Sequence, residues 1–159
     1  MNAVLLSLHV LAAIVAIGPI CVATSMFPAE ARRALDGRGE GAAPRLAVLA
    51  RICRVYAGVG IAVPVLGMMT AASMGVLSQS WVIVSMGLTL VAALVLAFAV
   101  LPRQQVLLAD VTARGTVADV QVRVRQEIGR LAMATGVFNL LWAAVTVLMI
   151  VRPGSTTGV

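Results

Sequence analysis

Four long apolar stretches run along the chain, each separated from the next by a shorter polar or charged segment. A helix needs about 20 mostly apolar residues to cross the hydrocarbon core of a bilayer. The stretches at about 3–27, 52–76, 81–101 and 131–151 all meet that length. Pro102 directly follows the third stretch and predicts its end, because proline cannot donate the hydrogen bond that continues a helix. The pattern predicts an all-α, up-and-down bundle of four transmembrane helices in one domain, residues 1–159.

The polar segments next to these stretches also carry a helical pattern. Around the first connection, AEARRAL (29–35) and RLAVLARICRVY (45–56) predict that the first two spans extend as helices beyond the bilayer. In the second connection, Thr116 and Asp119 have the spacing of a capping box. This spacing predicts a helix that begins there and continues into the fourth span.

Composition narrows the class of protein to an integral membrane protein. Hydrophobic residues make up 61% of the chain and charged residues 11%, whereas soluble domains carry about 25% charged residues. The net charge of +6 would suggest a nucleic-acid partner in a soluble protein. Here the basic residues stand at the ends of apolar stretches, which indicates membrane topology and no nucleic-acid partner. All twelve are arginine, as is typical of a GC-rich bacterial genome, so we expect a bacterial cytoplasmic (inner) membrane.

The arginines are distributed very unequally between the two sides of the predicted bundle. Positively charged loops stay in the cytoplasm. Only Arg152 falls on the side that holds both chain ends and the uncharged turn VLSQS (76–80). We therefore expect both termini to face outward. The arginines of the two predicted cytoplasmic loops are Arg32, Arg33, Arg38, Arg45, Arg51, Arg54, Arg103, Arg114, Arg123, Arg125 and Arg130.

Small residues form a stripe along one face of the second span. Membrane helices pack closely through such residues, because lipid removes the hydrophobic drive and leaves van der Waals contact. The stripe therefore predicts a helix-packing face, with a kink at its proline. Its members are Ala57, Gly60, Pro64, Gly67 and Ala71.

Polar side chains in all four spans are predicted to meet in the outer half of the membrane. His9, the only histidine, shares a helix face with Ala12, Ala13 and Ala16, so it should point into the bundle. Intramembrane polar groups usually face the interior and often mark function. The other candidate pocket residues are Ser85 and Thr89 in the third span and Asn139, Trp142 and Thr146 in the fourth, on a stripe that starts at Thr135.

Three roles are open for His9. It can form a structural hydrogen bond with Thr146, Trp142 or a nearby backbone carbonyl, it can ligate haem, or it can carry protons. One histidine cannot build a site for zinc or copper from protein ligands alone, so we expect no metal site. No Asp, Glu or Lys lies inside a predicted span and no catalytic motif is found, so no catalytic residue is predicted and an enzyme is disfavoured.

The first span resembles a known group of proteins through the motif LHVLAAIVAIG, with Leu8, His9 and Gly18. It resembles the first helix of an uncharacterised family of small bacterial four-helix integral membrane proteins, a domain of unknown function. CopD-type copper-resistance proteins and HemJ-type protoporphyrinogen oxidases are more distantly similar. In the oxidases this histidine binds haem, so the resemblance implies haem b at His9. The chain lacks the lysine of those oxidases and the further histidines of the copper proteins.

Three functions follow as hypotheses. The first is a non-enzymatic accessory or oligomerising subunit, with the lipid bilayer around it and a homo-oligomer or a larger membrane complex as its assembly. The second is a b-type haem-binding redox protein with His9 as axial ligand. The third is a carrier of a small molecule or metal that uses a polar pocket in the outer leaflet.

Overall fold

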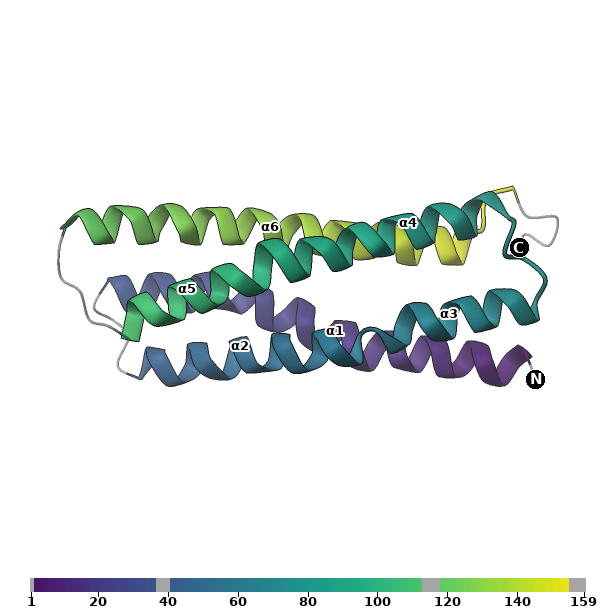
Figure 1. Cartoon of the computed structure of the whole chain (residues 1–159), viewed down its shortest axis with the longest axis horizontal. Helices are drawn as coiled ribbons and strands as arrows, with labels where there is room; N and C mark the ends of the chain where they lie inside the picture. Colours follow the sequence, from purple (N-terminus) through teal and green to yellow (C-terminus); the bar gives the residue numbers. More distant parts are fainter. Residues whose placement is uncertain (1, 37–40, 113–117, 155–159) are drawn as a thin grey trace.

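The structure, a computed structural model, describes residues 2–36, 41–112 and 118–154, and all regular secondary structure in these ranges is helical (Figure 1). Arg38, Arg114 and the predicted capping residue Thr116 lie outside these ranges. The helices are α1 (Asn2–Leu35), α2 (Ala42–Val59), α3 (Ala62–Ser73), α4 (Ser80–Leu94), the π-helical segment η1 (Val95–Val100), α5 (Leu101–Thr112) and α6 (Ala118–Val151).

These helices form four rods that are long and apolar enough to cross a membrane, as the sequence predicts. Each rod has 31 to 33 residues, about ten more than a bilayer core requires. The predicted helical extensions are therefore confirmed: α1 continues to Leu35, α2 begins at Ala42, and α6 enters the fourth span from Ala118 without interruption.

The rods run up and down. Figure 1 shows that α1 begins and α6 ends at the end of the bundle where α3 is joined to α4. The described ends of α1 and α5 lie at the opposite end, next to the starts of α2 and α6. Helix α1 packs against α2, α3 and α6, whereas α3 and α4 barely contact each other. The largest buried apolar side chains lie mostly in the half that carries the arginines, among them Phe27, Leu46, Leu107, Ile128 and Leu131.

The second span is interrupted at Gly60 and Ile61, one turn before the predicted kink at Pro64. Proline has no N–H to donate to the carbonyl four residues earlier, and its ring crowds that carbonyl. Here that carbonyl belongs to Gly60, and it accepts instead from the Val63 N–H at 3.1 Å. The proline therefore shapes the helix as expected, but the break falls at the residue whose hydrogen bond is lost.

The third span does not end at Pro102, contrary to the prediction. The preceding residues 95–100 widen into a π-helix, and the Leu101 N–H donates to the Leu96 carbonyl five residues earlier. This wider turn gives the proline ring room beside the carbonyl it would otherwise crowd. The Arg103 guanidinium donates to the Ala99 carbonyl at 2.7 Å, and the helix continues as α5 to Thr112.

The orientation of the bundle in the membrane remains a prediction from the arginine distribution. In a Cys21→Ala, Cys53→Ser background, a cysteine at position 78 should react with a membrane-impermeant thiol reagent added to intact cells. A cysteine at position 41, at the opposite end of the bundle, should react only after the membrane is opened. The reverse labelling pattern would contradict the outward-facing termini.

Candidate functional site

His9 packs against the second span. It is buried, and its Nδ1 lies 3.0 Å from the Val63 carbonyl oxygen of α3. This contact is the backbone alternative among the predicted structural partners. Thr146, another predicted partner, instead donates its hydroxyl to the Trp142 carbonyl in its own helix. The imidazole therefore ties α1 to α3 at the start of that helix.

Gly67 provides the surface on which the imidazole rests. A Cβ atom at this position would lie 2.9 Å from His9 Cε1, closer than side chains normally approach. Gly60 has a different role, since a Cβ there would meet the Tyr56 carbonyl oxygen of its own segment at 3.1 Å. Ala71 is buried and Pro64 is half-buried on the same side. Close approach between helices is thus visible at Gly67, whereas Gly60 lies at the helix break.

The polar residues predicted to converge in the outer half differ in their hydrogen bonding: the hydroxyls of Thr89 and Thr146 donate within their own helices, whereas two other candidates have no partner. Thr89 donates to the Ser85 carbonyl at 2.8 Å, and Thr146 is exposed on the bundle surface. The Ser85 hydroxyl and the Trp142 indole N–H are buried without a hydrogen-bond partner in the described part of the chain. Asn139, the remaining candidate, lies elsewhere, in a groove between α1 and α6.

This α1–α6 groove is a surface hollow of about 310 Å³ in the arginine-rich half of the bundle. One helical stripe from each helix forms its walls. Pro28, Ala29, Ala132 and Gly136 are small or compact and make the room. Of the polar members, Arg32 stands at one end, Ser25 and Asn139 stand at the other, and Thr135 lies between them. The complete lining is Ser25, Pro28, Ala29, Arg32, Ala132, Thr135, Gly136 and Asn139.

The deep end of the α1–α6 groove holds polar atoms without partners. Asn139 Nδ2 donates to Ser25 Oγ at 3.0 Å, but Oδ1 of the same amide has no partner. The Thr135 hydroxyl, on a residue that is 4% exposed, has none either. Every other threonine in the described ranges donates to a carbonyl of its own helix. Because unpaired buried polar groups are costly, these two are candidates for ligand contacts.

The shallow end of the α1–α6 groove carries Arg32. This side chain is exposed and forms no ion pair with any acidic residue in the described ranges. Seven residues separate Arg32 from Ser25, so the charge lies about 10 Å along α1 from the polar deep end. The groove therefore has a cationic mouth and a polar floor.

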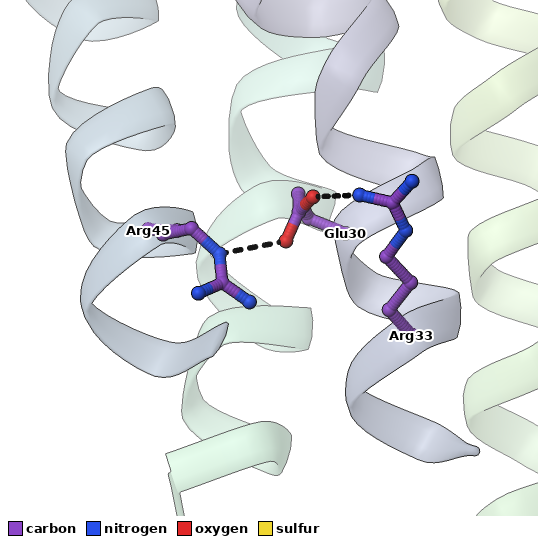
Figure 2. Close-up of polar contacts among 3 residues, drawn as sticks. All are labelled: Glu30, Arg33 and Arg45. Atoms are coloured by element: carbon purple, nitrogen blue, oxygen red, sulfur yellow. Dashed lines mark hydrogen bonds and ion pairs between the residues drawn. The ribbon is translucent and has the colours of Figure 1, made fainter. Parts of the chain in front are cut away.

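Beside this groove, ion pairs join helices at the same end of the bundle. Figure 2 shows the Glu30 carboxylate between two guanidinium groups, Arg33 at 2.7 Å and Arg45 at 2.9 Å. Glu30 is buried, and Arg45 comes from α2, so the carboxylate fastens α1 to α2. The further pairs are Arg125 with Asp36, and Arg103 and Arg130 with Glu127.

Sequence reasoning assigned no role to Ser25, Glu30 or Gln104. Gln104 is fully buried and donates to Cys53 Sγ at 3.4 Å, while its Oε1 has no partner in the described residues. Ser25 and Arg32 share a helix face at a spacing of seven in the predicted extended first helix, but this spacing alone does not show that α6 lies beside that face. The partners of Glu30 and Gln104 come from other helices, so local spacing contains no trace of them.

Within the described ranges, no group of three or more His, Cys, Asp or Glu residues could hold a metal ion. No curated protein and no solved structure matches the chain. One family model does match, over residues 3–153, and its description is a predicted integral membrane protein (DUF2269). The chain, with its four membrane-spanning rods, belongs to this family of predicted integral membrane proteins.

Proposed function

We propose that this protein binds an amphiphilic small molecule in the α1–α6 groove and performs no catalysis on it, in a bacterial cytoplasmic membrane. The observation that carries the proposal is the pair of buried, unpartnered oxygen atoms, Thr135 Oγ1 and Asn139 Oδ1, in the walls of an open groove. A buried polar atom without a hydrogen-bond partner is costly, so a polar part of a ligand is the natural partner of these two atoms.

This proposal keeps the carrier hypothesis but moves its pocket. The outer-half hydroxyls of Thr70, Thr89 and Thr146 are engaged with carbonyls of their own helices. The hollow with free polar atoms lies in the arginine-rich half instead. Assembly into a homo-oligomer or a larger complex, as an accessory subunit would require, stays a prediction from the sequence.

A variant that fills the groove tests the proposal. A Cβ added at Gly136 would meet nothing within 4 Å, so Gly136→Leu should place its side chain in the groove without disturbing the fold. We expect native mass spectrometry of wild-type protein in mild detergent to reveal a co-purified amphiphile, and the variant to lose it. The thermal stability of Gly136→Leu should stay close to that of a control variant, Gly87→Leu.

Gly87→Leu is the matched control, because its added Cβ also meets nothing within 4 Å and Gly87 does not line the groove. It should retain the bound amphiphile. An adduct kept equally by both variants, or absent from wild-type protein that has been extracted gently, would contradict the proposal.

Haem binding at His9 is a second candidate, favoured by one contact. Donation from Nδ1 to the Val63 carbonyl leaves Nε2 with a free lone pair, the arrangement typical of metal-bound histidine. Haem would supply one-electron chemistry, and His9 would be its axial ligand. Neither surface hollow described by the structure is lined by His9. A Soret band in the purified protein that disappears in His9→Gln would establish this candidate, and its absence from protein produced with sufficient haem would reject it.

A further inference from the structure

We infer that the ligand of the α1–α6 groove is an anionic phospholipid from the leaflet at the arginine-rich end, with its phosphate at Arg32 and its glycerol esters at Thr135. This inference rests on the proposed amphiphile-binding function and names the chemical class of the amphiphile. Four features of the groove support it: the charge at the mouth, the depth of the polar atoms, the hydrogen-bonding capacity of the walls, and the apolar surface beside the groove.

The neighbouring arginines Arg32 and Arg33 differ in whether they pair with an acidic residue. Arg33 is engaged with Glu30, whereas Arg32 lines the groove and pairs with no acidic residue in the described ranges. The planar guanidinium offers several donors in a geometry that suits phosphate oxygens. No acidic side chain lines the groove, so an anion at Arg32 meets no repulsion from its walls.

The depths of Thr135 and Asn139 in the groove fit the dimensions of one lipid leaflet. The headgroup region of one leaflet is roughly 5–8 Å thick. Along α6, Thr135 lies three residues, about 4.5 Å, deeper than Ala132 at the mouth, and Asn139 lies about 10 Å deeper. A phosphate bound at Arg32 therefore brings the glycerol esters to the level of Thr135.

The hydrogen-bonding capacity of the walls suits ester oxygens, which only accept. The Thr135 hydroxyl is not committed to its own helix and can rotate toward the groove to donate. The Ser25 hydroxyl can accept or donate, so the Asn139 amide can turn over and present its Nδ2 to the lipid. Both unpartnered groups are then satisfied by one ligand.

Exposed apolar surface next to the groove can accommodate the acyl chains of a lipid. A hollow of about 310 Å³ accommodates a headgroup and glycerol but not two complete chains. Beyond its deep end the neighbouring surface is apolar and exposed, with Val22 on α1 and Leu140 on α6. The chains can leave the groove along this surface and remain in the bilayer.

The test compares two lipids on the purified full-length protein. Native mass spectrometry titrations would use phosphatidylglycerol and phosphatidylcholine with identical acyl chains. We expect wild-type protein to bind phosphatidylglycerol about tenfold more tightly, as for one charge-assisted contact. Arg32→Gln should abolish this preference, because it removes the positive charge that favours a net-anionic headgroup, but keep weaker binding of zwitterionic phosphatidylcholine, which also carries a phosphate. Arg51→Gln is the matched control, because Arg51 is exposed and lies outside the groove. This variant should change the preference for phosphatidylglycerol less than about twofold.

Each contrary result has a distinct meaning. Equal binding of both lipids, or an Arg32→Gln variant that keeps the preference, would overturn the anionic assignment and leave the amphiphile proposal standing. If Arg51→Gln loses the preference for phosphatidylglycerol as well, that preference reflects general surface charge, and the proposed site at Arg32 is wrong. Displacement of the lipid by millimolar inorganic phosphate would identify a free anion as the ligand. Binding of neither lipid, nor of any co-purified amphiphile, would overturn the proposed function itself.

Discussion

Replacing Gly67 with leucine should destabilise the bundle by about 1–3 kcal/mol, the usual cost of overpacking a closely packed interface. Even a methyl group here would lie 2.9 Å from His9 Cε1. The ring cannot retreat freely, because its Nδ1 is held 3.0 Å from the Val63 carbonyl oxygen. Thermal unfolding in detergent should show a clearly lower midpoint than in wild-type protein.

The contact with His9 can be isolated by a double mutant. His9→Ala removes the ring, so in the Gly67→Leu background it should cost less stability than it does alone, as expected of two residues in contact. Gly87→Leu, with no atom near its added Cβ, should leave the midpoint almost unchanged. Wild-type stability in Gly67→Leu, or strictly additive effects of the two changes, would show that α1 and α3 do not meet as described.

Reversing the charge of Glu30 should produce the largest loss of thermal stability among single charge reversals. Glu30→Lys places a third cation between Arg33 and Arg45, where the carboxylate now accepts from both. The lysine would also lose the two hydrogen bonds that the largely buried carboxylate accepts, although the exposed guanidinium groups remain partly screened by water. The variant should unfold at a markedly lower temperature than wild-type protein when thermal unfolding is followed in detergent.

The second half of this test restores opposite charges. Arg45→Glu in the Glu30→Lys background should recover a substantial part of the lost stability, since one cation and one anion again face each other across α1 and α2. Asp110→Lys is the control. Asp110 lies at the same end of the bundle as Glu30 and forms no ion pair with any described residue. A control as damaging as Glu30→Lys, or a double variant without recovery, would contradict the role of Glu30.

The number of spans was predictable from the sequence because the rule behind it is local. An apolar run of sufficient length must be helical inside a bilayer, whatever surrounds it. Helix continuity was harder to predict, because the backbone adjusts to a proline some residues before it. The kink predicted at Pro64 occurs at Gly60, whose carbonyl loses its donor, whereas the end predicted at Pro102 is wrong, because the helix widens in η1 and continues.

The candidate site was harder to predict because it depends on pairs of helices. The polar stripe that starts at Thr135 can be recognised within one helix, and the sequence predicts that its members Asn139, Trp142 and Thr146 join a pocket in the outer half of the membrane. The structure instead places Asn139 against Ser25 of α1, where it forms a hydrogen bond at 3.0 Å. Which faces meet is decided by packing across the whole bundle, and spacing within one helix does not contain that information.

The most direct test of the α1–α6 groove is photo-crosslinking with a phosphatidylglycerol that carries a diazirine near the glycerol. After irradiation of the protein in bilayers of defined composition, mass spectrometry of its peptides would locate the adducts. We expect them to concentrate at residues 25–32 and 132–139, and to disappear from both segments in Gly136→Leu but not in Gly87→Leu. Adducts spread evenly over the exposed apolar residues of all four spans at that depth would contradict a lipid site in this groove.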